Sequence, residues 1–438
     1  MSTQELNNAL SASKLFTMGA AHGSVSVAGG WGQTAGHGPF TSLYGLGVDQ
    51  VLEYKVVIAD GSLKVANKVS NPDLFWALRG GGGGTFGVVV EATIKAYQDV
   101  PITFQEFWIN TTTGANNPEL FDAYSYLHTQ FPSLVSKGVT GYYYLWNGGI
   151  DVKMMTTGKD SGEANVRRIW QPIWDKLNAS EALNVKMSLL ITYPNFKAFF
   201  DGRFGPIESM PDMDFKQRLN KRHGPGGDGN EAVPKPEGIV PLDSRLLGAE
   251  HFASPNLTQA LEQANPAALG VPMGGLQGHL VAGGKVMDPD DDTSVLPAWR
   301  KAYVHVIGIK TLGMRGVDSL RRLAPGSGAY ANEADPQDTD WKRTFWGSNY
   351  VRLSKIKTKY DPEMVFWTTP GVNADLMEAR SEGRVCRTAT PAVAMARKTA
   401  PKNDNTNALK VDFGGTSNPQ TEAGDVEGIK PEGGENGL

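Results

Sequence analysis

Two glycine-rich segments of this sequence are candidate ligand-binding loops, because their residue types and spacing suit contact with a ligand. The first, "AGGWGQTAGHGPF", spans residues 28–40, and the second, "GGGGGTFG", spans residues 80–87. Because glycine has no Cβ, a flat ring or a phosphate can approach its backbone N–H group closely. Both segments match the loose form of the dinucleotide fingerprint, as Gly30-x-Gly32-x-x-Ala35 and Gly82-x-Gly84-x-x-Gly87.

The surroundings of both segments disfavour a Rossmann-type site. The fingerprint binds a pyrophosphate only where its glycine turn opens a helix. Pro39 interrupts a helix after the first segment, and the second runs directly into the β-branched stretch "VVVEATIKA". Two interpretations remain: the loops contact a flat or anionic ligand, or their glycines make tight turns within the protein.

The elements that must position these loops can be read from local patterns. Asp60-Gly61 lies between two strand-like stretches and predicts a hairpin. The segment 71–80 predicts a short helix, since Asn71 suits the cap and Pro72 the first helical position. From about residue 101 onward, strands alternate with amphipathic helices, which indicates a separate α+β lobe. Alternation along "TGYYYLW" would direct some of its tyrosines to a pocket and others to the core.

Composition narrows the class of partner. The 438 residues carry a net charge of −4 without a run of Lys or Arg, so we expect no nucleic-acid partner and favour a small molecule. No stretch reaches the about 18 apolar residues of a membrane span, and the N-terminus lacks a signal-peptide pattern. Cys386 is the single cysteine, which excludes an internal disulfide. The histidines, among them His128, His223, His279 and His305, are scattered without ligand spacing, so no metal site is predicted.

Three long motifs resemble the berberine-bridge-enzyme-like FAD-linked oxidases of the vanillyl-alcohol-oxidase and p-cresol-methylhydroxylase type. They are "VAGGWGQTAGHGPFTSLYGLGVDQVLEYKVVIADG", "NPDLFWALRGGGGGTFGVVVEATIKA" and "AYANEADPQDTDWKRTFWGSNYVRLSKIKTKYDPEMVF". The residues of these motifs are most similar to those of fungal members. The resemblance implies an α+β fold: a p-cresol-methylhydroxylase-type FAD-binding domain, incomplete at the N-terminus, and an α+β substrate domain with an antiparallel sheet. It implies that residues 1–100 are the remaining part of the FAD domain, 101–325 the substrate domain and 326–390 a segment returning to the FAD domain. The polar residues 391–438 are predicted to be a disordered tail.

The same resemblance implies site residues. The first glycine loop would lie along FAD, and Val89 would lie beside the adenine end. Asn349 and Tyr350 would face the flavin. The implied cofactor-binding residues in the loop are Gly29, Gly30, Gly32, Gln33, Gly36, His37 and Gly38. A Tyr-x-Asn pattern at Tyr330 would place a catalytic base over the flavin. A packed core role for Tyr330, and a backbone-bonded role for His37, remain open alternatives.

Two departures from the family pattern bear on the cofactor. His22 stands where many relatives have a cysteine that bonds the flavin, so we expect no cysteinyl link. The histidine that bonds the flavin in relatives would lie in a segment preceding Met1, which suggests an N-terminally incomplete sequence. Relatives are commonly secreted, but this sequence assigns no compartment.

Two functions therefore stay open. One is an FAD-dependent oxidase or dehydrogenase that transfers hydride from an alcohol, sugar or secondary metabolite to flavin and then electrons to dioxygen, acting as a monomer. The other is an inactive remnant or binding protein that retains the substrate domain.

Overall fold

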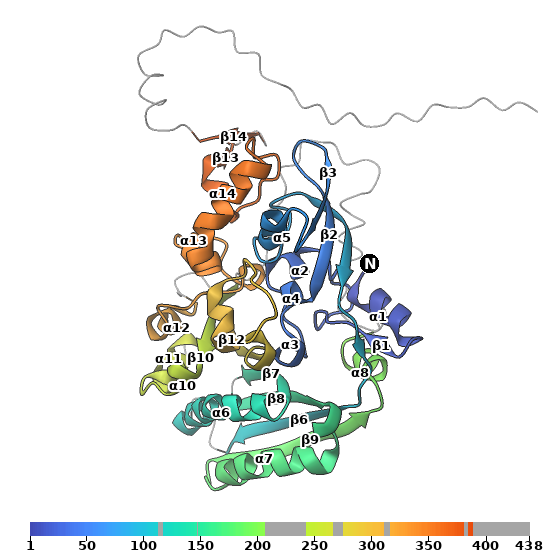
Figure 1. The fold of residues 1–438 in the computed structure, drawn as a ribbon. Helices are drawn as coiled ribbons and strands as arrows, with labels where there is room; N and C mark the ends of the chain where they lie inside the picture. The colour runs from blue at the N-terminus through green and yellow to red at the C-terminus, as the bar shows by residue number, and fades with distance from the viewer. Residues whose placement is uncertain are drawn as a thin grey trace, which may run out of the picture. The chain divides into compact units, whose positions relative to one another are not determined.

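A seven-stranded antiparallel sheet is the largest sheet that the computed structural model describes (Figure 1). Its strands follow the spatial order β10-β12-β11-β7-β8-β6-β9. In chain order they are β6 (Ile102–Thr111), β7 (Val139–Trp146), β8 (Gly149–Thr157), β9 (Leu183–Tyr193), β10 (Leu242–Gly248), β11 (Leu276–Leu280) and β12 (Ala302–Ile309). The structure describes residues 1–112, 117–146, 148–205, 242–265, 275–310, 316–380 and 384–388. The predicted tail, residues 391–438, lies outside them.

Helices cover one face of this sheet. They are α6 (Pro118–Ser136), α7 (Glu163–Asn178), α10 (Ala249–Phe252), α11 (Leu257–Ala264) and α12 (Asp318–Leu323). Their apolar side chains form one core with alternate strand residues such as Phe107, Tyr143 and Val306. Because successive side chains of a strand point to opposite faces, Tyr142 and Tyr144 lie on the other face, where they pack with the N-terminal glycine loop. The sheet therefore presents one face to helices and one to the candidate site.

A second sheet, of order β3-β2-β4, confirms the predicted hairpin and helix. It contains β2 (Val51–Val57), β3 (Leu63–Asn67) and β4 (Val88–Ile94), with Gly61 at φ +81° in the turn. The predicted helix is α5 (Pro72–Leu78). Asn71 precedes it in a left-handed conformation, but its amide donates to the Val65 carbonyl at 2.8 Å instead of capping the helix.

The C-terminal helices share a core with this small sheet. They are α13 (Trp341–Trp346) and α14 (Tyr350–Tyr360), and a hairpin of β13 (Met377–Ala379) and β14 (Val385–Arg387) follows them. Phe345 and Leu353 pack with Leu74 of α5. The buried Lys357 donates to the Thr85 carbonyl at 2.6 Å and pairs with Asp361, which fastens α14 to the end of the second glycine segment.

Short elements surround the first glycine loop. They are α1 (Thr3–Ser11), β1 (Leu15–Phe16), α2 (Gly30–Thr34), α3 (Thr41–Tyr44), α4 (Gly47–Gln50), β5 (Tyr97–Gln98) and α8 (Phe196–Arg203). Part of the predicted loop is thus the helix α2, which ends five residues before Pro39. No helix in the described ranges is both long and apolar enough to cross a bilayer. The α+β class is confirmed, while the domain boundaries stay a prediction.

Candidate functional site

A cavity of about 620 Å³ lies between the helix-free face of the large sheet and the first glycine loop. The sheet contributes tyrosines and a histidine, and the segment after α12 contributes Tyr330 and its neighbours. Its lining includes His22, Gly30, Trp31, His37, Tyr142, Tyr144, Gln277, His279, Tyr330, Asn332 and Glu333. Of the predicted site residues, the structure thus brings Gly30, His37 and Tyr330 together, with His22 beside them.

Most glycines of the first loop are required by the protein's own backbone. A Cβ on Gly32 would lie 2.1 Å from the Val27 carbonyl oxygen, and one on Gly38 would lie 2.0 Å from the Gly19 carbonyl oxygen. Gly36 has φ +76° and packs against Gly47. Around Gly30, in contrast, a Cβ would meet nothing within 4 Å, and Gly30 lines the cavity. Gly30 is therefore the glycine of this loop with room for a ligand against its backbone.

The two glycine segments contact each other directly. The Gln33 carbonyl accepts hydrogen bonds from the N–H groups of Gly80 and Gly82, at 3.1 and 3.0 Å. A Cβ on Gly83 would lie 2.7 Å from the Gly30 Cα atom. The Gln33 side chain is buried, and its Oε1 atom has no hydrogen-bond partner. The tight-packing interpretation thus holds for Gly32, Gly36 and Gly38, and the ligand-contact interpretation stays a prediction for Gly30.

Tyr330 is buried at the cavity wall with two donors on its hydroxyl. The Asn332 amide donates to its Oη atom at 2.7 Å, and the Gly36 backbone N–H also bonds it. Burial and the negative charge of Glu333 raise the pKa of the Tyr330 phenol, while the two donors lower it without reversing the direction. The environment therefore keeps the phenol protonated at neutral pH, although it supplies the donors that a phenolate needs.

Glu333 is a site residue that the sequence did not reveal. Its Oε2 atom lies 2.9 Å from His37 Nε2 and 3.4 Å from His305 Nδ1. Burial alone would raise the pKa of this carboxyl, but the imidazole of His37 and hydrogen bonding from His305 and His37 outweigh it and hold the pKa well below its usual range. Glu333 is therefore ionised at the cavity floor. Its position three residues after the predicted catalytic Tyr330 is the sequence feature that could have indicated Glu333 as a site residue.

The expectation that the histidines other than His37 are scattered is wrong for His279 and His305. His279 and His305 are directly paired across β11 and β12, so their side chains share the cavity-facing side of the sheet. His37 reaches them from the loop after α2, with ring centroids at 5.3 and 5.6 Å. Burial lowers the pKa of His279 to about 3 and also lowers that of His305. Sequence spacing missed the group because its members come from separate segments.

The remaining predicted residues lie outside the cavity. Asn349 donates its amide to the Val295 carbonyl at 2.8 Å, and the Tyr350 hydroxyl accepts from the Asn373 N–H at 3.1 Å. Val89 and Tyr350 pack on the core of the small sheet. Gly29 bonds the Ser26 carbonyl through its N–H. Cys386 lies in β14 and does not line the cavity. Their roles toward a cofactor stay predictions.

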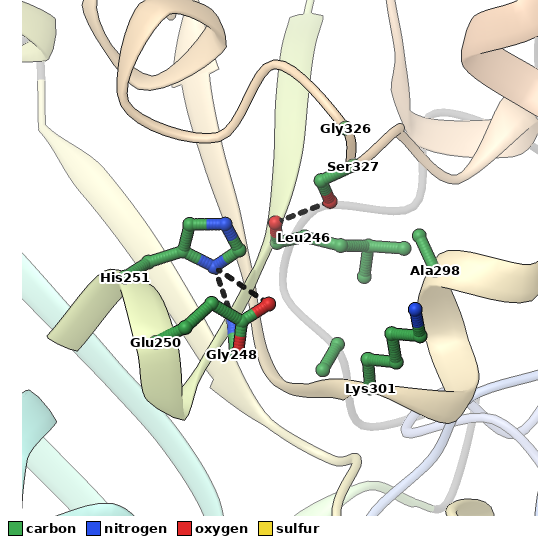
Figure 2. A pocket seen from close by; sticks show the side chains of 9 residues that line it. Leu246, Gly248, Glu250, His251, Ala298, Lys301, Gly326 and Ser327 are labelled. Atoms are coloured by element: carbon green, nitrogen blue, oxygen red, sulfur yellow. Dashed lines mark hydrogen bonds and ion pairs between the residues drawn. The ribbon is translucent and has the colours of Figure 1, made fainter.

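A smaller cavity of about 170 Å³ lies at the end of β10 (Figure 2). The His251 ring there accepts the Gly248 N–H at 2.8 Å, and the Ser327 hydroxyl donates to the Leu246 carbonyl at 2.6 Å. These polar groups support the local backbone. The larger cavity is therefore the candidate site.

Comparison with known proteins agrees with this choice. Residues 1–67 match the family described as FAD binding domain, and residues 329–373 match the family described as berberine and berberine like. The FAD-linked oxidoreductase patO of Aspergillus clavatus is 32% identical over 404 residues, covering 87% of this chain and 64% of the relative. An uncharacterized FAD-linked oxidoreductase of Arthroderma benhamiae is 31% identical over 393 residues, covering 83% and 61%.

A solved structure shows the same fold. The crystal structure of the VAO-type flavoprotein MtVAO713 from Myceliophthora thermophila C1 superposes with a TM-score of 0.75 at 27% identity, covering 88% of this chain and 68% of that one. These matches show that the chain is similar to berberine-bridge-enzyme-like FAD-linked oxidoreductases and has a vanillyl-alcohol-oxidase-type fold. The chain spans less than two thirds of the length of these curated relatives.

The residues present fit the ring of a flavin. Gly30 lines the cavity, and a Cβ there would meet nothing within 4 Å; the buried Gln33 Oε1 atom, in the same helix α2, has no hydrogen-bond partner. Trp31 and Tyr144 add aromatic walls. Among the described lining residues there is no Lys or Arg that would pair with a diphosphate. The family match supports FAD as the cofactor, and this cavity suits its ring.

Proposed function

We propose that the chain acts in an FAD-linked oxidoreductase that oxidises an alcohol, a sugar or a secondary metabolite in the cavity at Tyr330. The observation that carries the proposal is the buried Tyr330 hydroxyl, which faces the cavity and accepts the Asn332 amide at 2.7 Å. The family matches at residues 1–67 and 329–373 bracket this site and support it.

The protein's own part in the reaction is to hold the substrate and to take its hydroxyl proton. FAD, when bound, accepts a hydride from the substrate carbon and returns the electrons to dioxygen. Tyr330 takes this proton at Oη in its ionised form, and the Asn332 amide and the Gly36 N–H stabilise that phenolate before the transfer. Because burial and Glu333 raise the pKa of the phenol, proton removal becomes easier as the pH rises.

The cavity walls favour a ring-shaped substrate with hydroxyl groups. Tyr142 and Tyr144 lie two positions apart on the cavity-facing side of one strand. Aromatic rings pack well on sugar or aromatic rings. The Tyr142 hydroxyl is buried without a hydrogen-bond partner, so it is free to bond a substrate oxygen. These features support a polyol or an aromatic alcohol over an aliphatic chain.

A spectrum and a variant pair test this proposal. Purified protein should show the absorption bands of oxidised flavin at about 370 and 450 nm. Anaerobic addition of a substrate, chosen from a panel of sugars and aromatic alcohols, should bleach these bands. Tyr330→Phe should retain the bands and slow bleaching by about a hundredfold. Tyr303→Phe, on the helix-facing side of β12, is the matched control and should bleach at the wild-type rate. Equal rates for both variants would refute the role of Tyr330.

A second function, ligand binding without catalysis, is favoured by two observations. His22 occupies the place of the flavin-bonding cysteine, and the described cavity lining lacks a cation for a diphosphate. A colourless protein that still binds a ring-shaped polyol would support this alternative. If flavin is present, we propose that it is held without a cysteinyl bond, so denaturing precipitation should leave the colour in the supernatant.

A further inference from the structure

Three imidazoles and one carboxylate meet beside the cavity, which His37, His279 and Glu333 line and behind which His305 is buried. His37, His279, His305 and Glu333 each offer one ligand atom, and these four atoms all lie within 4.8 Å of one another. His37 follows α2, His279 and His305 lie on β11 and β12, and Glu333 ends a 3₁₀ turn after Tyr330. Four separate segments thus direct nitrogen and oxygen ligands at one point.

The spacing suits a metal ion. Tetrahedral zinc with bonds of about 2.1 Å holds its ligand atoms about 3.4 Å apart. The Glu333 Oε2 atom already lies 2.9 Å from His37 Nε2 and 3.4 Å from His305 Nδ1. The longest separations need to shorten by about 1.4 Å, which small side-chain rotations can supply.

The hydrogen bonds of this group are incomplete without a ligand. The Nδ1 atoms of His37 and His279 and the Nε2 atom of His305 have no hydrogen-bond partner in the protein, and His305 Nδ1 has only the 3.4 Å contact with Glu333 Oε2. The His305 side chain is 0% exposed, and His37 and His279 are each 7% exposed. Buried polar atoms in native proteins nearly always have a partner. The three imidazoles lie close to one another, so a single ion would be a partner for several of these nitrogens at once.

The supporting backbone is hydrogen-bonded and closely packed. His279 and His305 form a directly opposed pair in the sheet, next to Tyr142 on β7. The His37 carbonyl accepts the Trp31 indole N–H at 2.8 Å, and Gly36 and Gly38 on either side pack against backbone. Ligands on strands and on a packed loop are held in place before the ion arrives.

We propose that His37, His279, His305 and Glu333 form a binding site for a divalent transition-metal ion of the zinc type. Three imidazoles with one carboxylate are the ligands that zinc and its neighbours in the first transition row prefer. Magnesium and calcium favour sets of oxygen ligands and geometries that this site does not offer. The site needs no flavin, so this proposal is independent of the proposed function.

Equilibrium dialysis of the full chain against Zn²⁺, without a histidine tag and after chelator treatment, tests the proposal. Elemental analysis should find one zinc per chain at saturation, and the melting temperature should rise with zinc concentration. A millimolar Mg²⁺ competitor should not displace the zinc. His279→Gln and Glu333→Gln should each weaken zinc binding by at least about tenfold, because even the loss of an outer-shell partner costs that much.

His251→Gln is the matched control, because that histidine lies outside the cluster beside α10. It should bind zinc as the wild type does. Zinc that binds equally well to all variants, or that does not bind at all, would overturn the proposal and leave a polar pocket for water. Displacement of zinc by Mg²⁺ would overturn the assigned class of ion. If the cluster variants do not fold by circular dichroism, X-ray absorption of the wild-type zinc form decides: a shell with imidazole scattering supports the site, and an oxygen-only shell refutes it.

Discussion

Alanine at Gly38 and at Gly30 should have opposite effects on stability. A Cβ on Gly38 would lie 2.0 Å from the Gly19 carbonyl oxygen, whereas real Cβ atoms essentially never approach closer than 3.0 Å. The two backbone segments must therefore separate by about 1 Å, and overpacking of this kind costs about 1–3 kcal/mol. The loss of glycine's freedom in the unfolded chain offsets about 0.4–1 kcal/mol. Gly38→Ala should thus destabilise the fold by about 1–2 kcal/mol.

Gly30→Ala meets no such obstacle. A Cβ there has nothing within 4 Å, so only the effect on the unfolded chain remains, and the variant should gain about 0.4–1 kcal/mol. Because Gly30 lines the cavity, the new methyl group should weaken flavin retention while the fold stays intact. Stability and cofactor binding would then separate at this one position.

Urea unfolding followed by tryptophan fluorescence measures both changes. The midpoint should fall for Gly38→Ala and rise slightly for Gly30→Ala, at an unchanged slope. Gly326→Ala is the control, since a Cβ there also meets nothing within 4 Å. A midpoint for Gly38→Ala equal to that of the wild type would refute the argument that close backbone packing requires this glycine.

Three further predictions concern polar side chains and their hydrogen bonds or ion pairs. Tyr143→Phe removes the hydrogen bond to His128 Nε2 at 2.8 Å, and it should cost about 1–3 kcal/mol in the same urea assay because the buried imidazole loses its partner. Lys357→Met should cost about 3–5 kcal/mol at neutral pH, because it leaves the Asp361 carboxylate buried without its cation. Burial raises the pKa of Asp361, but Lys357 and two backbone N–H groups outweigh burial and lower this pKa. The wild type should therefore lose the stability that the ion pair contributes as the pH falls below the ordinary Asp range. The difference in unfolding free energy between wild type and Lys357→Met should shrink there. Asn332→Ala should reduce substrate-dependent flavin bleaching on the order of tenfold, the worth of one hydrogen bond of about 1.4 kcal/mol, without moving the urea midpoint by more than a few tenths of a molar; an unchanged bleaching rate would contradict its role at the phenol.

Local patterns were sufficient for the individual elements. The Asp60-Gly61 turn, the helix after Asn71 and the strand after Gly87 all follow from residues within a few positions of one another. The alternation along Tyr142, Tyr143 and Tyr144 correctly divides cavity from core, because a strand's side-chain period is a local property. The motifs also predicted the resemblance to FAD-linked oxidoreductases and the α+β class, and the comparisons confirm both.

Only the tertiary structure decided the site itself. The hydrogen bond between His37 and Glu333 joins residues 296 positions apart, and the pairing of His279 with His305 depends on the order and register of β11 and β12. The tertiary structure also separates the glycines that close contact with neighbouring backbone requires from Gly30, which lines the cavity. The physical reason is that residue type and local period fix what one segment forms, whereas strand order, register and close backbone contacts between distant segments fix which side chains meet.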